Sequence, residues 1–193
     1  MATMAGSDRR TGAETRAEIL RVALELFTEK GFEGTSTRDI SSALGITKSS
    51  LYYHFENKDA IVTGLVEQRR HELEDLVEWI SAQPRTPDLL RRAAVRWVES
   101  STPERLKVMR LAQANQPVMR RLAAGGKDVR AGFDVVIDLL VEDDATELDR
   151  LCTRMVFDTV SAALLAARGT AASPADVIAA ARRATIALTD TDA

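Results

Sequence analysis

Residues 31–61 read GFEGTSTRDISSALGITKSSLYYHFENKDAI and are the most informative part of the sequence. Ser36 precedes Asp39 at the spacing of a capping box, which predicts the start of a short helix. Gly45 supplies a tight turn, and Thr47 then caps a second short helix that we expect to end near His54. The stretch therefore predicts two short helices joined by a glycine turn.

The flanking residues extend this unit on both sides. A helix is expected from about Thr15 to Lys30, because its apolar residues recur at helical spacing. Asn57 is placed to cap a long helix that follows. Together these elements predict a three-helix, helix-turn-helix unit over residues 15–60, preceded by a disordered arm over residues 1–14.

The remaining chain, residues 61–193, shows helical periodicity and weak strand signals. Thr86 and Thr102 each precede a proline that suits the first turn of a helix, and Gly169 closes a long helix. The expected helices cover residues 87–100, 103–114, 128–142, 145–168 and 174–189. With about nine helices in all, the sequence predicts an all-α protein whose C-terminal part is a helical bundle.

The composition is that of an ordinary globular protein. Apolar residues make up 45% and charged residues 28%, and the formal net charge is -3, so there is no overall basic signature. No apolar run reaches transmembrane length and the first residues show no signal-peptide pattern, so we expect a cytoplasmic protein without membrane contact. The single cysteine, Cys152, excludes an intramolecular disulfide, and its apolar neighbours predict a small core residue.

The sequence lacks the residue patterns that catalysis or metal binding needs. His54 and His71 are the only histidines, and neither has a plausible cysteine or serine partner for nucleophilic catalysis. The sequence shows no metal-spaced cluster of His, Cys, Asp and Glu, and no glycine-rich phosphate loop. We therefore expect no enzyme, no metal and no cofactor.

The second short helix concentrates polar and aromatic side chains on a few turns. These side chains are Lys48, Ser49, Ser50, Tyr52, Tyr53 and His54. They suit the phosphate backbone and the major groove of duplex DNA, and the small serines would let the helix approach base edges. Lys48 opposes the helix dipole, so a phosphate or guanine partner would explain it, while a solvated lysine is the alternative.

Two threonines at the start of the first short helix extend this candidate DNA surface. Thr35 and Thr37 lie where hydroxyl groups and free N–H groups can bind a phosphate. Plain N-capping is the alternative role for either residue. We expect the two residues to contribute to the DNA-binding surface.

A signature of residues runs through the whole stretch. It consists of Gly31-Phe32, Thr35-Ser36, Ile40, Gly45-Ile46-Thr47, Leu51-Tyr52-Tyr53-His54-Phe55 and Asn57-Lys58. This signature resembles the tetracycline-repressor (TetR) family of bacterial transcription regulators. The resemblance implies that Tyr52 or Tyr53 reaches a phosphate or a thymine methyl group, that His54 reaches a phosphate, and that Lys58 clamps one. His54 could instead cap its helix, and Ser49 stands where the family often has glycine.

The resemblance implies a ligand-responsive repressor that binds a palindromic operator as a dimer and is released by a small-molecule effector. A single helix-turn-helix buries too little surface for tight binding, which also favours a dimer. We expect the interface in the helices at residues 145–168 and 174–189. The apolar stripe of the first of these contains Leu148, Leu151, Cys152, Met155, Val156, Thr159, Val160, Ala163 and Leu164. The alternative is that this stripe is intramolecular core.

The resemblance also implies a small-molecule site in the C-terminal ligand-binding and dimerisation domain. The candidate lining residues are Trp79, Trp97, Met109, Gln113, Phe133 and Met155. Most of them are equally compatible with ordinary core positions. The rival hypothesis for the whole chain is an all-helical protein–protein adaptor, which would lack the steep salt dependence of DNA binding.

Overall fold

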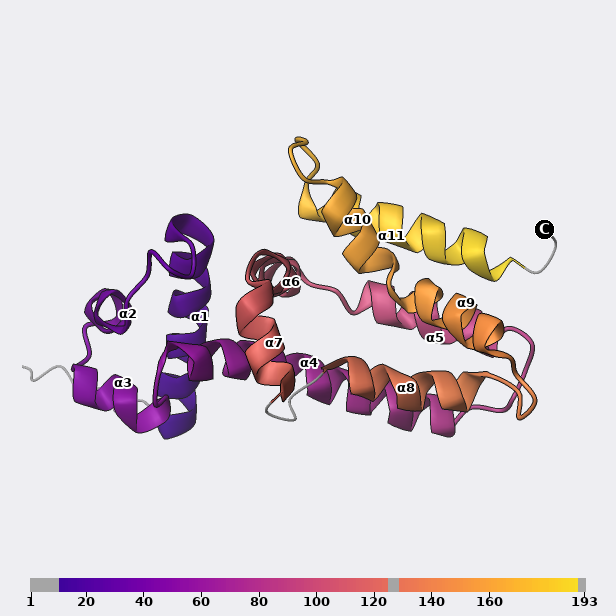
Figure 1. Cartoon of the computed structure of the whole chain (residues 1–193), viewed down its shortest axis with the longest axis horizontal. Coiled ribbons are helices and arrows are strands. Elements are labelled where there is room, and N and C mark those ends of the chain that lie inside the picture. The colour runs from indigo at the N-terminus through magenta and orange to yellow at the C-terminus, as the bar shows by residue number, and fades with distance from the viewer. Residues whose placement is uncertain (1–10, 125–128, 191–193) are drawn as a thin grey trace, which may run out of the picture. The chain divides into compact units, whose positions relative to one another are not determined.

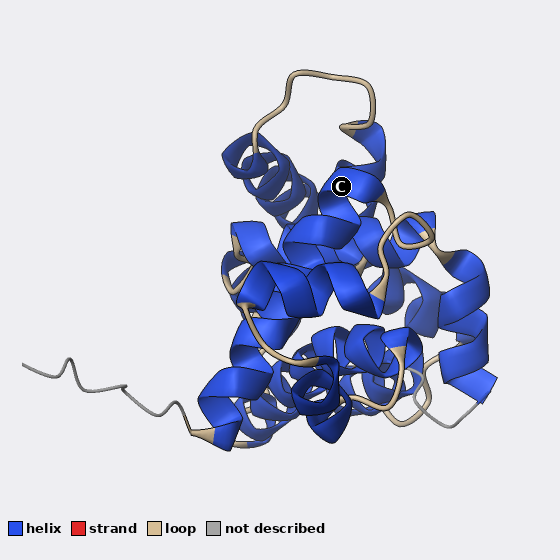
Figure 2. Cartoon of the chain, turned by 90° about the vertical axis from the view of Figure 1, so that its left-hand side faces the viewer, coloured by secondary structure: helices blue, strands red, loops and turns tan. Residues whose placement is uncertain are grey.

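The computed structural model describes residues 11–124 and 129–190. Over these residues the chain forms eleven helices and no strand, which confirms the predicted all-α class (Figure 2). The chain divides into two compact units that meet in the sequence between Leu65 and Val66. Each unit has its own buried residues.

The first unit contains α1 (Gly12–Lys30), α2 (Thr37–Leu44), α3 (Lys48–His54) and the first two turns of α4 (Lys58–Ser81) (Figure 1). The predicted capping box of α2 is present, since Ser36 and Asp39 each accept a hydrogen bond from the other's backbone N–H. Gly45 ends α2 in the left-handed conformation, with φ 65°, and Thr47 caps α3. The core of this unit is made of Ile19, Ala23, Phe27, Ile40, Leu51, Phe55 and Ile61.

The N-terminal boundary differs from the prediction. Helix α1 begins at Gly12 rather than near Thr15. Thr11 is its N-cap and forms a capping box with Glu14, so the helix starts about one turn before the predicted position. Residues 11–14 of the expected disordered arm are therefore part of a capped helix. Residues 1–10 of that arm lie outside the described residues.

Helix α4 approaches the rest of the first unit closely at Gly64. A Cβ atom there would lie 3.0 Å from Leu20 Cδ2 and 3.0 Å from Phe55 Cε1. Such distances are tighter than ordinary van der Waals contact, so glycine allows the start of α4 to pack directly on α1 and on the residue that ends α3. This contact holds the start of α4 against the unit that contains α2 and α3.

The second unit contains the rest of α4 and seven further described helices. These are α5 (Leu89–Glu99), α6 (Pro103–Ala114), α7 (Gln116–Ala124), α8 (Val129–Leu140), α9 (Glu147–Phe157), α10 (Thr159–Ala166) and α11 (Pro174–Thr189). One buried cluster joins α4, α5, α8 and α9 around Leu76, Trp97 and Val136. A second cluster joins the end of α5 to α6, α10 and α11 around Val98, Leu106 and Val177.

The start of one predicted helix in the second unit, expected at residue 87, differs from the structure. Thr86 and Pro87 precede α5, whose N-cap is Asp88. Pro117 lies in the first turn of α7, where a missing N–H costs no helical hydrogen bond. Residue 128, where the next helix was expected to begin, lies outside the described residues.

The predicted helix over residues 145–168 is divided into α9 and α10 at Asp158. A buried side-chain hydrogen bond accompanies the break, since the hydroxyl groups of Thr159 and Thr185 lie 2.7 Å apart. The Thr159 hydroxyl also donates to the carbonyl oxygen of Val156 at 3.3 Å. These contacts tie the start of α10 to α11 and turn it away from a straight continuation of α9.

Among the helices that the structure describes, none combines the length and apolar character needed to cross a membrane. Over the same residues, no group of three or more His, Cys, Asp and Glu side chains is placed to hold a metal ion.

Candidate functional site

Helix α3 presents a polar and aromatic face to solvent and is fixed by apolar residues behind it. Leu51 is fully buried and Phe55 is 3% exposed, so these two side chains attach the helix to the unit. On the outer side, Lys48 and Ser49 are exposed. Tyr52 is 48% exposed and Tyr53 is 85% exposed, which is unusual for side chains that bury well. This face matches the one that the sequence predicted for DNA.

Polar contacts connect α2 with this face of α3. The hydroxyl oxygen of Thr37, the first residue of α2, lies 3.2 Å from the phenolic oxygen of Tyr52. His54 is half-buried, and the ring of Tyr53 meets its ring edge-on, with centroids 5.1 Å apart. Ser50 is half-buried as well, and its backbone N–H donates to the Thr47 cap. Thr37 thus lies beside the predicted DNA-contacting residues of α3.

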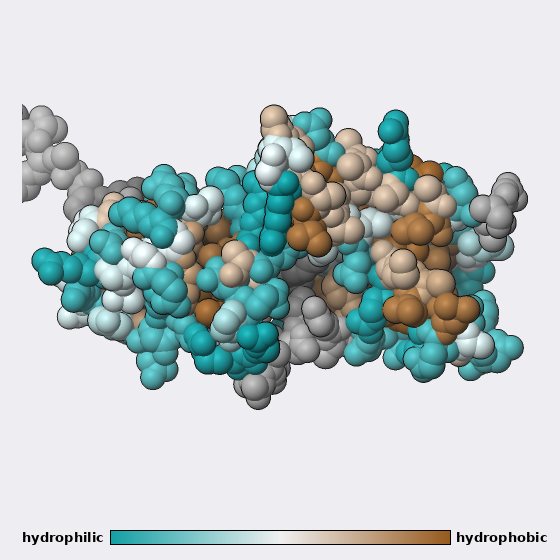
Figure 3. Space-filling view, turned by 45° about the horizontal axis from the view of Figure 1, so that its top comes forward, coloured by the Kyte–Doolittle hydropathy of each residue, from teal (hydrophilic) through white to brown (hydrophobic). Residues whose placement is uncertain are grey.

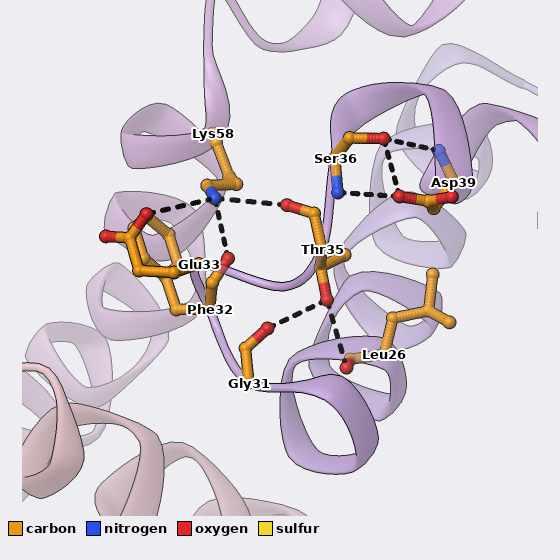
Figure 4. A network of polar contacts seen from close by, with 8 residues as sticks. All are labelled: Leu26, Gly31, Phe32, Glu33, Thr35, Ser36, Asp39 and Lys58. Atoms are coloured by element: carbon orange, nitrogen blue, oxygen red, sulfur yellow. Dashed lines mark hydrogen bonds and ion pairs between the residues drawn. The ribbon is translucent and has the colours of Figure 1, made fainter.

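Thr35 does not join this surface, which corrects its predicted role. Its residue is 1% exposed, and its hydroxyl lies 3.1 Å from the carbonyl oxygen of Leu26 and 2.9 Å from that of Gly31 (Figure 4). Both acceptors belong to the end of α1. The Thr35 hydroxyl therefore anchors the connection between α1 and α2 instead of facing a phosphate.

Lys58 also points inward, which contradicts its predicted role as a phosphate clamp. Its ammonium donates to the carbonyl oxygen of Phe32 at 2.6 Å and to that of Thr35 at 3.0 Å (Figure 4). The same nitrogen lies 4.1 Å from the centre of the Phe32 ring and 3.9 Å from the carboxylate of Glu33. The side chain is 21% exposed, so its charge is used within the protein.

The second unit contains an open cleft with a volume of about 790 Å³. Of the predicted pocket residues, Trp79 and Trp97 line it. Charged side chains line most of the rest: Glu72, Asp75, Asp88, Arg91, Arg92, Arg96, Glu99 and Arg182. The cleft is therefore more polar than the predicted apolar cavity. Sequence reasoning missed most of these residues because their charges suggested solvated helix faces.

The other predicted pocket residues lie elsewhere in the second unit. Met109 packs in the cluster of α6, α10 and α11, and Phe133 packs edge-on against Trp97 at 5.2 Å. Gln113 donates to the carbonyl oxygen of Ser161 at 3.3 Å. Met155 is 52% exposed on the outside of α9. The structure thus does not bring the six predicted residues together.

A buried ion pair lies beside the cleft. Arg105 has a side chain that is 6% exposed, and its guanidinium lies 2.8 Å from the carboxylate of Glu72. The guanidinium carbon also lies 4.2 Å from the centre of the Trp97 ring, and one nitrogen donates to the Ser100 hydroxyl at 2.7 Å. Burial lowers the pKa of Arg105, and the negative charge of Glu72 opposes that shift. The pair connects α4 with α6.

The predicted dimer stripe is divided between core and surface. Val156, Thr159, Val160 and Leu164 are buried, so that part is intramolecular core. Leu148, Leu151, Met155, Leu165 and Leu188 remain 52–67% exposed, and Cys152 is exposed instead of buried as expected. We call these six exposed residues of α9, α10 and α11 the α9–α11 apolar surface. Apolar residues gather on the face of the second unit drawn in Figure 3.

The first unit resembles known proteins in sequence. The profile of bacterial regulatory proteins of the tetR family matches residues 19–65, which include α2, α3 and the start of α4. The chain is 32% identical over 103 residues to the HTH-type transcriptional regulator AcrR of Shigella flexneri, covering 52% of this chain and 48% of that protein. It is 48% identical over 50 residues to the IcaR negative transcriptional regulator of Staphylococcus epidermidis, covering 26% and 27%. The chain thus spans about half or less of the length of these curated relatives.

Solved structures extend the likeness in fold to nearly the whole chain. A TetR-family transcriptional regulator from Agrobacterium tumefaciens aligns with a TM-score of 0.63 and 24% identity, covering 92% of this chain and 98% of that chain. The ketosteroid transcriptional regulator KstR2 of Mycobacterium tuberculosis aligns with a TM-score of 0.65 and 20% identity, covering 97% of both chains. In residues 19–65 the chain is therefore similar to the TetR family of bacterial transcription regulators, and over nearly its whole length it shares the fold of solved regulators of that family.

Proposed function

We propose that this chain is a repressor that binds a palindromic operator as a dimer and is released by a small-molecule effector. The observation that carries the proposal is the exposed face of α3. Two tyrosines that are 48% and 85% exposed, Tyr52 and Tyr53, share a seven-residue helix with the exposed Lys48. A helix of this kind after a tight turn is the part of a helix-turn-helix that enters the major groove.

Each exposed group of α3 has a chemical match on duplex DNA. Lys48 can bind a phosphate or the acceptor edge of guanine. The ring of Tyr53 can contact a thymine methyl group, and its hydroxyl can donate to a phosphate. Ser49 adds little bulk, so the backbone of α3 can approach the base edges. These matches support α3 as the reading helix and leave Tyr52, held beside Thr37, to contact the backbone.

The α9–α11 apolar surface supports a homodimer. Its five large apolar side chains are 52–67% exposed, and apolar surface of this kind is stabilised when a partner covers it. A second copy of the chain can cover this surface with the same residues, because a two-fold axis pairs a self-complementary surface with itself. Two subunits also supply the two reading helices that a palindromic operator requires.

The charged cleft of the second unit supports effector binding. Its volume of about 790 Å³ lies in the range of small-molecule sites, and Trp79 offers a flat apolar surface beside Arg92 and Arg96. Helix α4 contributes Glu72 and Trp79 to this cleft and begins within the first unit. An effector that binds more tightly to a position of α4 that does not suit the operator would weaken operator binding. By linkage, the operator would weaken effector binding by the same factor.

The proposal is tested by measuring operator affinity of three variants against wild type. We expect Lys48→Ala, Tyr52→Ala and Tyr53→Ala to fold normally, because the three side chains are exposed, and to bind operator DNA more weakly. Lys107 lies on α6 in the second unit, and Lys107→Ala is the control for general charge loss. If all three folded variants bind like wild type, α3 is not the reading helix and the adaptor hypothesis becomes the better one.

A further inference from the structure

The interior contacts of Lys58 stand out among the charged residues of the first unit. An ammonium group has three hydrogen-bond donors, and the carbonyl oxygens of Phe32 and Thr35 accept two of them at 2.6 and 3.0 Å. The Glu33 carboxylate and the face of the Phe32 ring lie beside the same nitrogen, at 3.9 and 4.1 Å. The ammonium therefore has two hydrogen-bond acceptors, a carboxylate and an aromatic ring around it within the protein.

The place of Lys58 in its helix explains why the side chain turns inward. Lys58 is the first residue of α4, and a cation at a helix N-terminus is disfavoured by the helix dipole. Asn57 already caps this end, accepting the backbone N–H of Ala60 at 2.8 Å. The carbonyl oxygens of residues 32 and 35 give the charge a favourable partner that the helix itself cannot provide.

The segment that Lys58 holds is the connection between α1 and α2. Thr35 is fixed on one side by its hydroxyl contacts to the end of α1 and on the other side by its carbonyl contact to Lys58. Ser36 then caps α2, and Thr37 begins it. The Thr37 hydroxyl in turn contacts Tyr52 on α3. A continuous series of contacts therefore runs from the start of α4 to the face of α3.

We propose that Lys58 is a positioning residue for DNA binding: it makes no phosphate contact and instead sets the position of α2, and through Thr37 that of Tyr52. The proposal rests on the operator binding proposed above. It also assigns a route for regulation. Because Lys58 is the first residue of α4, a displacement of that helix pulls on the two carbonyl groups and shifts the start of α2 relative to α3.

The test compares two lysine variants of the full-length protein on operator DNA across a salt series. Lys58→Met and Lys48→Met each remove an ammonium and keep a long side chain. Each lost phosphate contact lowers the slope of log affinity against log salt by about one, so Lys48→Met should lower the slope by about two per dimer. Lys58→Met should leave the slope unchanged while weakening binding by at least about tenfold.

Amide hydrogen exchange supplies a second readout in the same variants. Lys58→Met should speed exchange at residues 33–37 and leave exchange in α1 unchanged, whereas Lys48→Met should change neither. A slope that falls by as much in Lys58→Met as in Lys48→Met would overturn the proposal. Unchanged affinity together with unchanged exchange at residues 33–37 would overturn it as well.

A measurement on wild-type protein covers the case in which Lys58→Met does not fold. Acetylation of surface lysines, followed by mass spectrometry, reports the access to each ammonium group. Lys58 should resist acetylation in the free protein and in the DNA complex, while Lys48 should react in the free protein and be protected by DNA. A Lys58 that reacts freely until DNA is added is a phosphate contact. Absence of selective DNA binding by wild type would instead reject the proposed function itself.

Discussion

Replacing Leu151 by glutamate tests the proposed dimer, and the exposed fraction of Leu151 allows the expected loss of dimerisation free energy to be calculated. Leu151 belongs to the α9–α11 apolar surface and is 54% exposed in the single chain. Complete burial of a leucine side chain contributes about 1.5–3 kcal/mol, so covering its exposed half contributes about 1–1.5 kcal/mol. A two-fold axis places two copies of Leu151 in one interface. The lost contribution is therefore about 2–3 kcal/mol per dimer.

This loss raises the dimer dissociation constant by about 30- to 150-fold. The figure is a lower bound, because two carboxylates brought into an apolar interface also lose hydration. The fold of each subunit should survive, since the side chain is half in solvent before association. Sedimentation velocity over a range of protein concentrations measures the dissociation constant, and circular dichroism checks the helical content.

A matched control separates the interface from a general effect of added charge. Val135 on α8 is 49% exposed and lies outside the α9–α11 apolar surface, so Val135→Glu should dissociate like wild type. The reasoning is refuted if Leu151→Glu and Val135→Glu have the same dissociation constant as wild type. It is also refuted if Val135→Glu alone produces monomers.

Three further predictions concern stability. Thr35→Val should destabilise the protein by about 0.5–1.5 kcal/mol in chemical denaturation, because the hydrogen bonds of the Thr35 hydroxyl to two part-buried carbonyl groups are lost. Glu72→Ala should cost about 2–4 kcal/mol, since it leaves the charge of Arg105 buried, while Glu74→Ala, from an exposed pair, should cost less than about 0.5 kcal/mol. The capping contacts from Ser36 hold the pKa of Asp39 below its ordinary value. The ionised Asp39 carboxylate therefore contributes to the stability of the folded state at neutral pH, and this contribution is lost as the pH falls below about 4. The melting temperatures of wild type and Asp39→Asn should converge at that low pH.

The caps and turns of the first unit could be predicted because their partners are close in the sequence. Ser36 and Asp39 satisfy each other within one helical turn, and Thr47 caps α3 in the same local way. Gly45 adopts the left-handed conformation, with φ 65°, that its residue type favours. Local chemistry of this kind needs no knowledge of the fold, so helices α2 and α3 were predicted with nearly correct ends.

The roles of Thr35 and Lys58 depend on residues that only the fold brings together. The acceptors of Lys58 are 23 and 26 residues earlier in the chain, and the Leu26 carbonyl is 9 residues before Thr35. The sequence shows that both side chains are polar and lie near the start of a helix. It does not show whether they point to solvent or to the interior, and the predicted phosphate contacts were wrong for that reason.

The predictions for the second unit failed for a different physical reason. Apolar periodicity identifies a helix face that avoids water, but a neighbouring helix and a partner subunit satisfy that face equally well. Asp158 also divides the expected helix, so residues before and after it meet different surroundings. Val160 is consequently buried, while Met155 is 52% exposed.

The central claim is that α3 reads a specific DNA site as part of a dimer. Fluorescence anisotropy of the purified protein tests it, using duplex DNA from the regions flanking its own gene and scrambled DNA across a salt series. Random-pool selection supplies a site if the flanking regions contain none.

We predict tight and sequence-selective binding that weakens steeply with salt, with two subunits or a multiple of two on each site. Equal binding to selected and scrambled DNA, or a selection that enriches no sequence, would contradict it.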